Sequence, residues 1–347
     1  MNSGLINLFA PAVAEERQHP IFSRLQQPEY LPEQEVLNHW SEGFVDRDGK
    51  FVQEFQTSFE SSMWELYIFA CIKDLGGKVE FSHIAPDFVT SLADQDLCIE
   101  ATVARPAQGS APPHGAGPPD PLNDLYAFNA ESMLRICNSF ERKAKKYLRS
   151  YGSFSHVQGK PYVIALAPFS SPHSHFSVDR PIATALYGIF ADEEATLSLG
   201  LPEILQYAVN AVAKTPSTDV DLGYFCDADY DFVSAVIYSP IANWGKIRAL
   251  AAAPNAWTFY HTLHRNPNSL APRFRSAMKQ DYTEHLLDGL YIFHNPFARI
   301  PLDPTTFCHE RVAQIVFEDG LTPRLIAPLD FLQVRMLYSL RQQTVPK

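Results

Sequence analysis

The sequence predicts an α/β fold in which a mixed sheet is flanked by helices. Three observations lead to this prediction. An amphipathic helical segment begins near residue 57, three short apolar runs typical of strands follow it, and a long basic helix then precedes a further apolar strand at 162–166. The resulting order is αβββαβ. Helices and strands that alternate in this way pack as layers, with helices covering the faces of one sheet.

The first helix of this core is defined at both ends. Thr57-Ser58-Phe59-Glu60 has the pattern of a capping box, and Gly76-Gly77 is expected to end the helix. Between them, apolar residues recur at helical spacing: Met63, Trp64, Tyr67, Ile68, Cys71 and Leu75. Glu65 lies beside this apolar stripe, where an acid that faces a site would have to be.

Strands are expected next at 78–82, 87–91 and 97–104, and the second and third carry the candidate site acids. Asp87 follows Pro86 at the start of an apolar run, and Glu100 ends another. Residues two apart in a strand share a face, so Glu100 and Thr102 point the same way. If the two strands pair as a hairpin, Asp87 and Glu100 converge on one hard cation. Mg²⁺ suits such a site because it takes one or two carboxylates and keeps several waters.

A long helix is expected at 123–149, after a Pro- and Gly-rich loop at 106–121 that is predicted to lack regular structure. Steps of 100° place Arg142, Lys146 and Arg149 on the side away from its apolar stripe. Lys143 and Lys145 lie at the two edges of the stripe. Edge lysines can bend their stems along the core and present the ammonium to a site at the sheet.

The C-terminal half is expected to extend the same domain. Helices are predicted at 181–190, 202–213, 244–253 and 329–343, and strands at 231–239 and 289–296. Segments 311–318 and 323–326 flank Asp319-Gly320, a hairpin dipeptide. We therefore divide the chain into a helical lead-in at 1–56, a core at 57–170 and an elaboration at 171–347.

Composition limits the class of protein. No stretch approaches 18 uninterrupted apolar residues, the N-terminus does not resemble a secretory signal, and five scattered cysteines do not suggest a disulfide framework. We expect a cytoplasmic protein with no membrane partner. The net charge of −11 argues against a general nucleic-acid coat protein. A local basic cluster on the 123–149 helix can still follow a phosphate backbone.

Other chemistries lack their motifs. The twelve histidines do not have zinc-ligand spacing. The sequence also contains no phosphate-binding glycine loop and no Gly-x-Ser-x-Gly turn.

The Pro86-Asp87 pair, the strand that ends Glu100-Ala101-Thr102 and the upstream helical Glu65 together resemble the PD-(D/E)xK, or restriction-endonuclease-like, nuclease superfamily. The resemblance covers about a third of the chain, residues 57–170. It departs from the family pattern at Thr102, where the family has lysine. In several branches of that superfamily a lysine on the following helix replaces the missing one, which makes Lys143 the main candidate, ahead of Lys145 and Lys146.

The resemblance implies a Mg²⁺- or Mn²⁺-dependent endonuclease that hydrolyses DNA phosphodiesters. Asp87 and Glu100 would hold the metal, Glu65 would support a metal-bound water or a second ion, and the Thr102 hydroxyl would bond a metal-bound water. Lys143 would supply the missing cation. RNA as substrate and a homodimer stay possible, and a role in phage defence or as a toxin is compatible with such a site. The alternatives are a nuclease fold kept as an inactive nucleic-acid or protein platform, and strand-end acids that merely face water.

Overall fold

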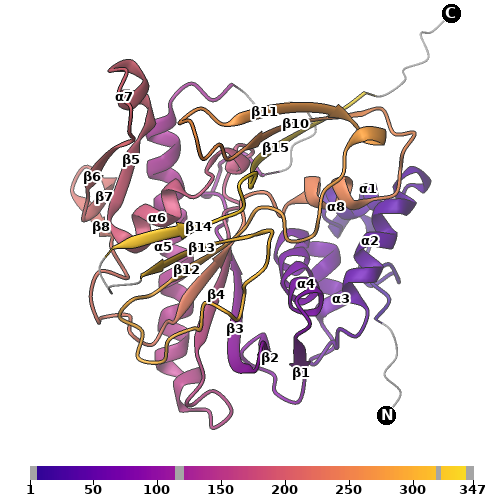
Figure 1. Cartoon of the computed structure of the whole chain (residues 1–347). Helices are drawn as coiled ribbons and strands as arrows, with labels where there is room; N and C mark the ends of the chain where they lie inside the picture. Colours follow the sequence, from indigo (N-terminus) through magenta and orange to yellow (C-terminus); the bar gives the residue numbers. More distant parts are fainter. Residues whose placement is uncertain (1–5, 114–120, 318–321, 341–347) are drawn as a thin grey trace, which may run out of the picture.

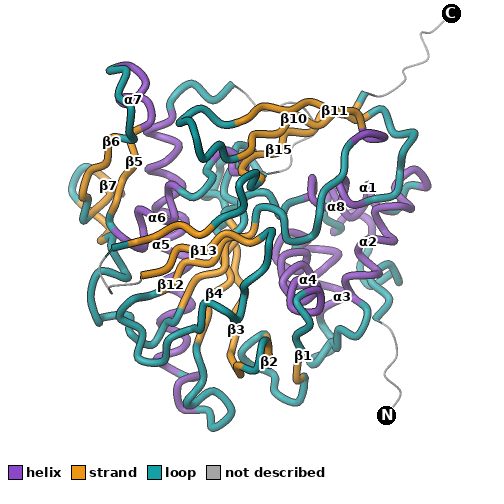
Figure 2. Tube along the Cα trace, viewed as in Figure 1, coloured by secondary structure: helices purple, strands orange, loops and turns teal. Residues whose placement is uncertain are grey.

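The computed structural model describes residues 6–113, 121–317 and 322–340. Within these ranges the protein is an α/β fold built on a mixed eight-stranded sheet, with three smaller sheets and eight helices. Figures 1 and 2 show the large sheet running through the middle of the molecule with helices on both sides. The predicted fold class is confirmed.

The large sheet has the strand order β1-β2-β3-β4-β9-β12-β13-β14. Its strands are β1 (Lys78–Glu80), β2 (Phe88–Leu92), β3 (Gln95–Val103), β4 (Tyr162–Ala167), β9 (Ala235–Tyr238), β12 (Leu290–His294), β13 (Val312–Phe317) and β14 (Pro323–Ile326). β9 lies beside β4, so the C-terminal half extends the same sheet, as predicted. All six residues of β4 are buried, as expected for a strand covered on both faces.

The strand directions bring the two predicted acids together. β2 and β3 pair antiparallel, with Phe88 opposite Ile99. β3, β4 and β9 are parallel neighbours. The hairpin that the sequence predicts between the strand of Asp87 and the strand of Glu100 is therefore present. β13 and β14 also pair antiparallel, as predicted, while the turn between them at 318–321 lies outside the described residues.

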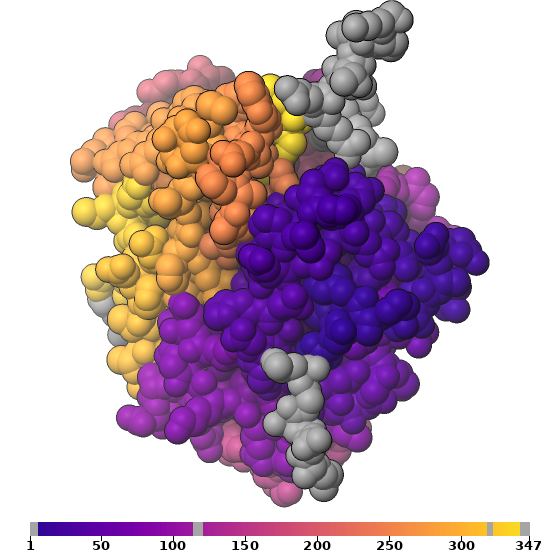
Figure 3. Space-filling view, turned by 90° about the vertical axis from the view of Figure 1, so that its right-hand side faces the viewer, coloured from indigo at the N-terminus to yellow at the C-terminus, as the bar shows by residue number. Residues whose placement is uncertain are grey.

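Helices cover the two faces of the sheet with two separate apolar cores. α1 (Pro20–Leu25), α2 (Leu31–Ser41), α3 (Phe51–Thr57), α4 (Phe59–Asp74) and α8 (Trp244–Leu250) contribute to the first core. α5 (Leu125–Arg149) and α6 (Arg180–Tyr187) contribute to the second. The short α7 (Glu193–Ser198) lies at the edge of the molecule (Figure 1). In Figure 3 the N-terminal segment, coloured indigo, covers the centre and right of the face turned to the viewer.

α4 is held against the sheet by polar contacts as well as by packing. The indole Nε1 of Trp64 donates to the carbonyl oxygen of Ala165 in β4 at 3.0 Å, and the Tyr67 hydroxyl donates to the carbonyl of Leu286 at 3.0 Å. The capping box predicted at Thr57–Glu60 is wrong, since the N-cap residue is Ser58 and its side chain makes no capping bond. Burial on the sheet therefore stabilises this helix more than its N-cap does.

Two segments predicted as helices are strands. Residues 202–213 contain β6 (Leu205–Ala208), which pairs with β5 (Ile189–Asp192), and the start of β7 (Ala211–Thr215), which pairs with β8 (Thr218–Asp221). Residues 332–339, predicted as part of a C-terminal helix, form β15 (Leu332–Ser339). β15 pairs with β10 (Thr258–His264), which also pairs with β11 (Arg273–Met278). Backbone pairing with other strands decides these elements: β6 and β7 pair with strands nearby in the sequence, and β15 pairs with a distant one.

The loop at 106–121 contains neither helix nor strand in its described part, and residues 114–120 lie outside the described residues. None of the helices in the described part of the chain is long and apolar enough to cross a membrane. All five cysteines are free thiols, and Cys71, Cys98 and Cys137 are buried.

Candidate functional site

Glu100 is the centre of a group of polar side chains between β3 and α5. Its side chain has no exposed surface, and both of its carboxylate oxygens accept hydrogen bonds. Its Oε1 accepts from Nζ of Lys143 at 2.6 Å, from Nζ of Lys146 at 3.1 Å and from the hydroxyl of Tyr151 at 3.2 Å. A buried carboxylate needs such partners, because burial without them is very costly.

The Asp87 carboxylate lies next to Glu100 at the start of β2. The backbone N–H of Asp87 donates to Oε2 of Glu100 at 3.3 Å, and Oδ2 of Asp87 accepts from the backbone N–H of Ala101 at 2.7 Å. Burial, and then the neighbouring charge of Glu100, raises the pKa of Asp87 to about 6, while Lys143 opposes the shift. The structure thus brings Asp87, Glu100 and Lys143 together, as the sequence predicts.

Glu65 approaches the same group from α4, on the other side of the hairpin. The side chain is half-buried. Burial, and then the charge of Asp87, raises the pKa of Glu65 well above its ordinary value, and Arg47 is the strongest group acting against this. A carboxylate that raises the pKa of another lies near it, and a cation between the two would favour the ionised form of both.

Thr102 lies one alternation beyond Glu100 on β3, and its hydroxyl accepts a hydrogen bond from Nη2 of Arg142 at 2.8 Å. The prediction that Arg142 and Lys146 point away from the site is wrong. Both are long side chains at the exposed C-terminal half of α5, and their heads bend back over the helix surface to reach β3. Lys145, a weaker candidate, is turned away and pairs with Glu141 one helical turn earlier.

A cavity of about 330 Å³ joins these elements. Glu65 and Asp87 contribute carboxylates to its wall, and α5 and the end of β3 contribute cations. Its lining residues are Ser61, Glu65, Asp87, Ala101, Thr102, Val103, Arg105, Arg142, Lys143 and Lys146. Glu65 and Asp87 also line a second cavity of about 140 Å³ together with Arg47. The two acids therefore line both cavities, and each cavity also contains at least one basic side chain.

The residues present fit a Mg²⁺ ion held by two carboxylates and water. Glu100 is already bonded at both oxygens, and no group of three or more His, Cys, Asp or Glu residues in the described ranges is placed to hold a metal. Mg²⁺ does not require such a group, because one or two carboxylates and several waters satisfy it. Asp87 and Glu65 offer that pair, and a divalent cation would favour their ionised forms, which burial and then the neighbouring carboxylates disfavour.

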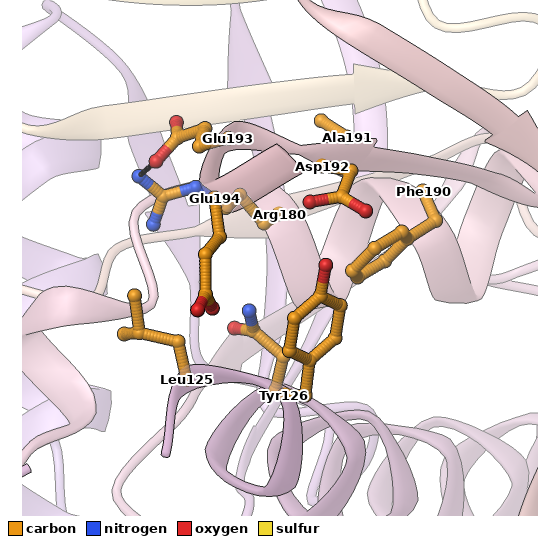
Figure 4. A pocket seen from close by; sticks show the side chains of 9 residues that line it. Leu125, Tyr126, Arg180, Phe190, Ala191, Asp192, Glu193 and Glu194 are labelled. Carbon is orange, nitrogen blue, oxygen red and sulfur yellow. Dashed lines mark hydrogen bonds and ion pairs between the residues drawn. The ribbon is translucent and has the colours of Figure 1, made fainter. Parts of the chain in front are cut away.

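Two other cavities are less suited to chemistry on a charged substrate. The cavity in Figure 4, between α5 and the start of α7, has a volume of about 30 Å³, which is room for little more than a water molecule. Its Arg180 is paired with Glu193. A cavity of about 600 Å³ beside Trp244 and Arg335 has no carboxylate among its described lining residues, so it offers no ligand for a hard cation.

Sequence reasoning missed two residues of the main cavity and one beside it. Arg105 follows β3 and donates from Nη2 to the Ser61 hydroxyl at 2.9 Å, and Arg142 was assigned to the wrong side of its helix. Tyr151 lies in a short 3₁₀ turn (Tyr151–Ser153) just after α5. Arg105 could have been predicted, because it lies three residues after Thr102 on the same segment. No local sequence pattern points to Tyr151.

Comparison of the chain with protein-family models, with curated proteins and with solved structures found no match. The site must therefore be interpreted from its own chemistry.

Proposed function

We propose that the protein is a Mg²⁺- or Mn²⁺-dependent endonuclease of the PD-(D/E)xK type that hydrolyses DNA phosphodiesters. The observation that carries this proposal is the cavity in which Glu65 and Asp87 face Arg105, Arg142, Lys143 and Lys146. A phosphodiester with a divalent cation needs both kinds of group within one small volume. Carboxylates hold the cation, and basic side chains neutralise the phosphate.

Each residue has a distinct part in this proposal. Asp87 and Glu65 would hold the ion, which when bound lowers the pKa of a water and offsets charge that builds on the phosphate. Lys143, Lys146 and Tyr151 hold Glu100 in one position. Glu100 in turn accepts the backbone N–H of Asp87 and so fixes the start of β2. Glu100 thus positions the metal-binding acid.

The ionisation of Asp87 suits this task near neutral pH. With a pKa of about 6 its carboxyl is mostly ionised at pH 7. It also retains one oxygen beyond the Oδ2 atom that accepts from Ala101. That oxygen is available to a cation or to an attacking water.

The test is nicking of supercoiled plasmid with Mg²⁺ or Mn²⁺, compared with EDTA. We expect cleavage only with the metal, and loss of cleavage in Asp87→Ala. Asp96→Ala is the matched control, because Asp96 lies in the same β2–β3 hairpin, on β3, but is exposed and makes only a long pair with Lys160 at 3.9 Å. Metal-dependent cleavage that survives in Asp87→Ala would exclude this site.

A second candidate is a nuclease-like platform that binds nucleic acid without cutting it. The observation that favours it is the pairing of Glu100 with two lysines, which leaves two carboxylates rather than three for a metal. Binding of DNA in EDTA, with no cleavage when either metal is added, would support this candidate over the first. A role in phage defence or as a toxin fits the enzyme alone. The free thiols of all five cysteines are compatible with a location in the cytoplasm.

A further inference from the structure

The cations around the cavity divide into two groups by their partners. Lys143 and Lys146 pair with Glu100, at 2.6 and 3.1 Å. The guanidinium groups of Arg105 and Arg142 have no carboxylate within ion-pair distance among the residues that the structure describes, although both side chains are exposed at the cavity. The positive charge that remains for a ligand is therefore on the two arginines.

Both arginines are held by a hydroxyl group instead of a carboxylate. Nη2 of Arg142 donates to the hydroxyl of Thr102 at 2.8 Å, and Nη2 of Arg105 donates to the hydroxyl of Ser61 at 2.9 Å. Arg105 follows β3 and is held by Ser61 on α4, whereas Arg142 lies on α5 and is held by Thr102 on β3, so the two guanidiniums are anchored between the sheet and the helices on its opposite faces. A neutral hydroxyl fixes each group without cancelling its charge.

The geometry of arginine suits a phosphate in this position. A guanidinium has five N–H donors in a rigid fork, and within the described residues each of these two donates to only one acceptor. The remaining donors match the oxygens of a phosphodiester, which arginine binds in a bidentate way. The cavity of about 330 Å³ lies within the size range of ligand pockets.

We propose that Arg105 and Arg142 form a phosphate-binding site that receives a backbone phosphate of DNA beside Asp87 and Glu65. Thr102, at the position where the PD-(D/E)xK pattern has lysine, is a positioning residue that holds the Arg142 guanidinium. Lys143 and Lys146 serve Glu100 and not the phosphate. This inference deepens the proposed function and rests on it for the identity of the ligand, but binding at the arginines requires no metal and no cleavage.

The test measures binding of a fluorescein-labelled DNA duplex in EDTA. Fluorescence anisotropy reports the affinity at each of several salt concentrations. We expect Arg142→Ala and Arg105→Ala each to weaken binding about tenfold. Each should also reduce the slope of log affinity against log salt concentration by about one, which corresponds to one phosphate contact. Arg135→Ala is the matched control. Arg135 is on the same helix, but it pairs with Glu131 outside the cavity, so its removal should change affinity less than twofold.

Thr102→Val separates positioning from charge. It removes the hydroxyl that orients Arg142 and keeps the cation, so affinity should fall severalfold while the salt slope stays as in the wild type. Both arginines are exposed, so their truncation should leave the folded state intact, which circular dichroism would verify.

The outcomes distinguish the two proposals. Arginine variants that bind DNA as the Arg135→Ala control does, or a wild-type protein that binds no DNA, would overturn the phosphate site. Arginine-dependent binding without metal-dependent cleavage would overturn the proposed nuclease and leave the phosphate site standing. Metal-dependent cleavage, together with a DNA affinity that neither arginine variant changes, would overturn the phosphate site and leave the proposed nuclease standing.

Discussion

The ammonium of Lys143 lies 2.6 Å from Oε1 of Glu100, whose side chain has no exposed surface. This ion pair joins the C-terminal half of α5 to the middle of β3. Lys146 contacts the same oxygen, but half of its side chain is exposed, and its ammonium also lies over the ring of Tyr151 at 4.8 Å. The two lysines therefore differ in how much the fold depends on them.

Replacing Lys143 should destabilise the protein. Lys143→Met keeps the apolar stem and removes the charge, which leaves the carboxylate of buried Glu100 with Lys146, Tyr151 and the backbone N–H of Asp87. We expect the free energy of unfolding to fall by about 1–3 kcal/mol, measured by urea denaturation. Lys145→Met is the control, since that lysine pairs with Glu141 at the surface and should change stability by less than about 0.5 kcal/mol.

A double-mutant cycle tests whether Glu100 is the cause. In a Glu100→Gln background, Lys143→Met should cost much less, because no buried charge is left unpaired. Equal costs in both backgrounds would contradict the importance of the ion pair.

The stability of the wild type relative to Asp87→Asn should depend on pH. The folded-state pKa of Asp87 is about 6, above its unfolded value of about 3.9. The folded state therefore binds more protons between these values, so the free energy of unfolding falls as pH rises from about 4 to about 6. Asparagine has no such dependence. Urea titrations at pH 4 and pH 7 should show the wild type losing stability relative to the variant, and an unchanged difference would refute the shift.

Metal affinity should have the opposite pH dependence. A carboxyl must be ionised to hold Mg²⁺, and the pKa values of both Asp87 and Glu65 are raised. Affinity should therefore be weak at pH 5 and increase through pH 6, measured by isothermal titration with Mg²⁺ after treatment with EDTA. Asp87→Asn should abolish the increase near pH 6. An affinity that does not vary between pH 5 and 7 would argue against these two acids as ligands.

A second buried charge cluster should matter for stability and not for the site. Glu284 pairs with Lys246 and with Arg335, and all three side chains are at most 1% exposed. Burial alone would raise the pKa of Glu284, but Arg335 and Lys246 hold it below the ordinary value. The stability that this ionised carboxylate contributes is therefore present at neutral pH, and it decreases as pH falls below about 4.3, the unfolded value.

Glu284→Gln leaves two buried cations without their carboxylate. We expect the free energy of unfolding to fall by about 3–5 kcal/mol. Glu80→Gln, at an exposed acid, is the control and should be nearly neutral. A loss below about 1 kcal/mol for Glu284→Gln would mean that the cluster contributes little.

The sequence by itself determined the αβββαβ order of the core and the pairing of the acids. Helical and strand periodicities are local properties, so α4, β2, β3, α5 and β4 were predicted within a few residues of their observed ends. The alternation along β3 placed Glu100 and Thr102 on one face. The antiparallel hairpin then required Asp87 to lie beside Glu100, as it does.

Only the tertiary structure decided elements whose partners are distant in the sequence. Residues 332–339 contain apolar positions that are compatible with a helix or a strand, and pairing with β10, about 70 residues earlier, makes them β15. Residues 205–208 become β6 because β5 offers a free strand edge. Local patterns contain no information on such partners.

The composition of the cavity was likewise a tertiary outcome. A helical wheel gives the direction of a Cβ atom, but the charged groups of Arg142 and Lys146 lie several bonds further along flexible stems. The hydroxyl of Thr102 and the carboxylate of Glu100 decide where they lie. Arg105 and Glu65 enter the same cavity only because α4 and the end of β3 meet there. The sequence therefore determined which acids lie together on the hairpin, whereas packing of α4 and α5 against the sheet decided which cations face them.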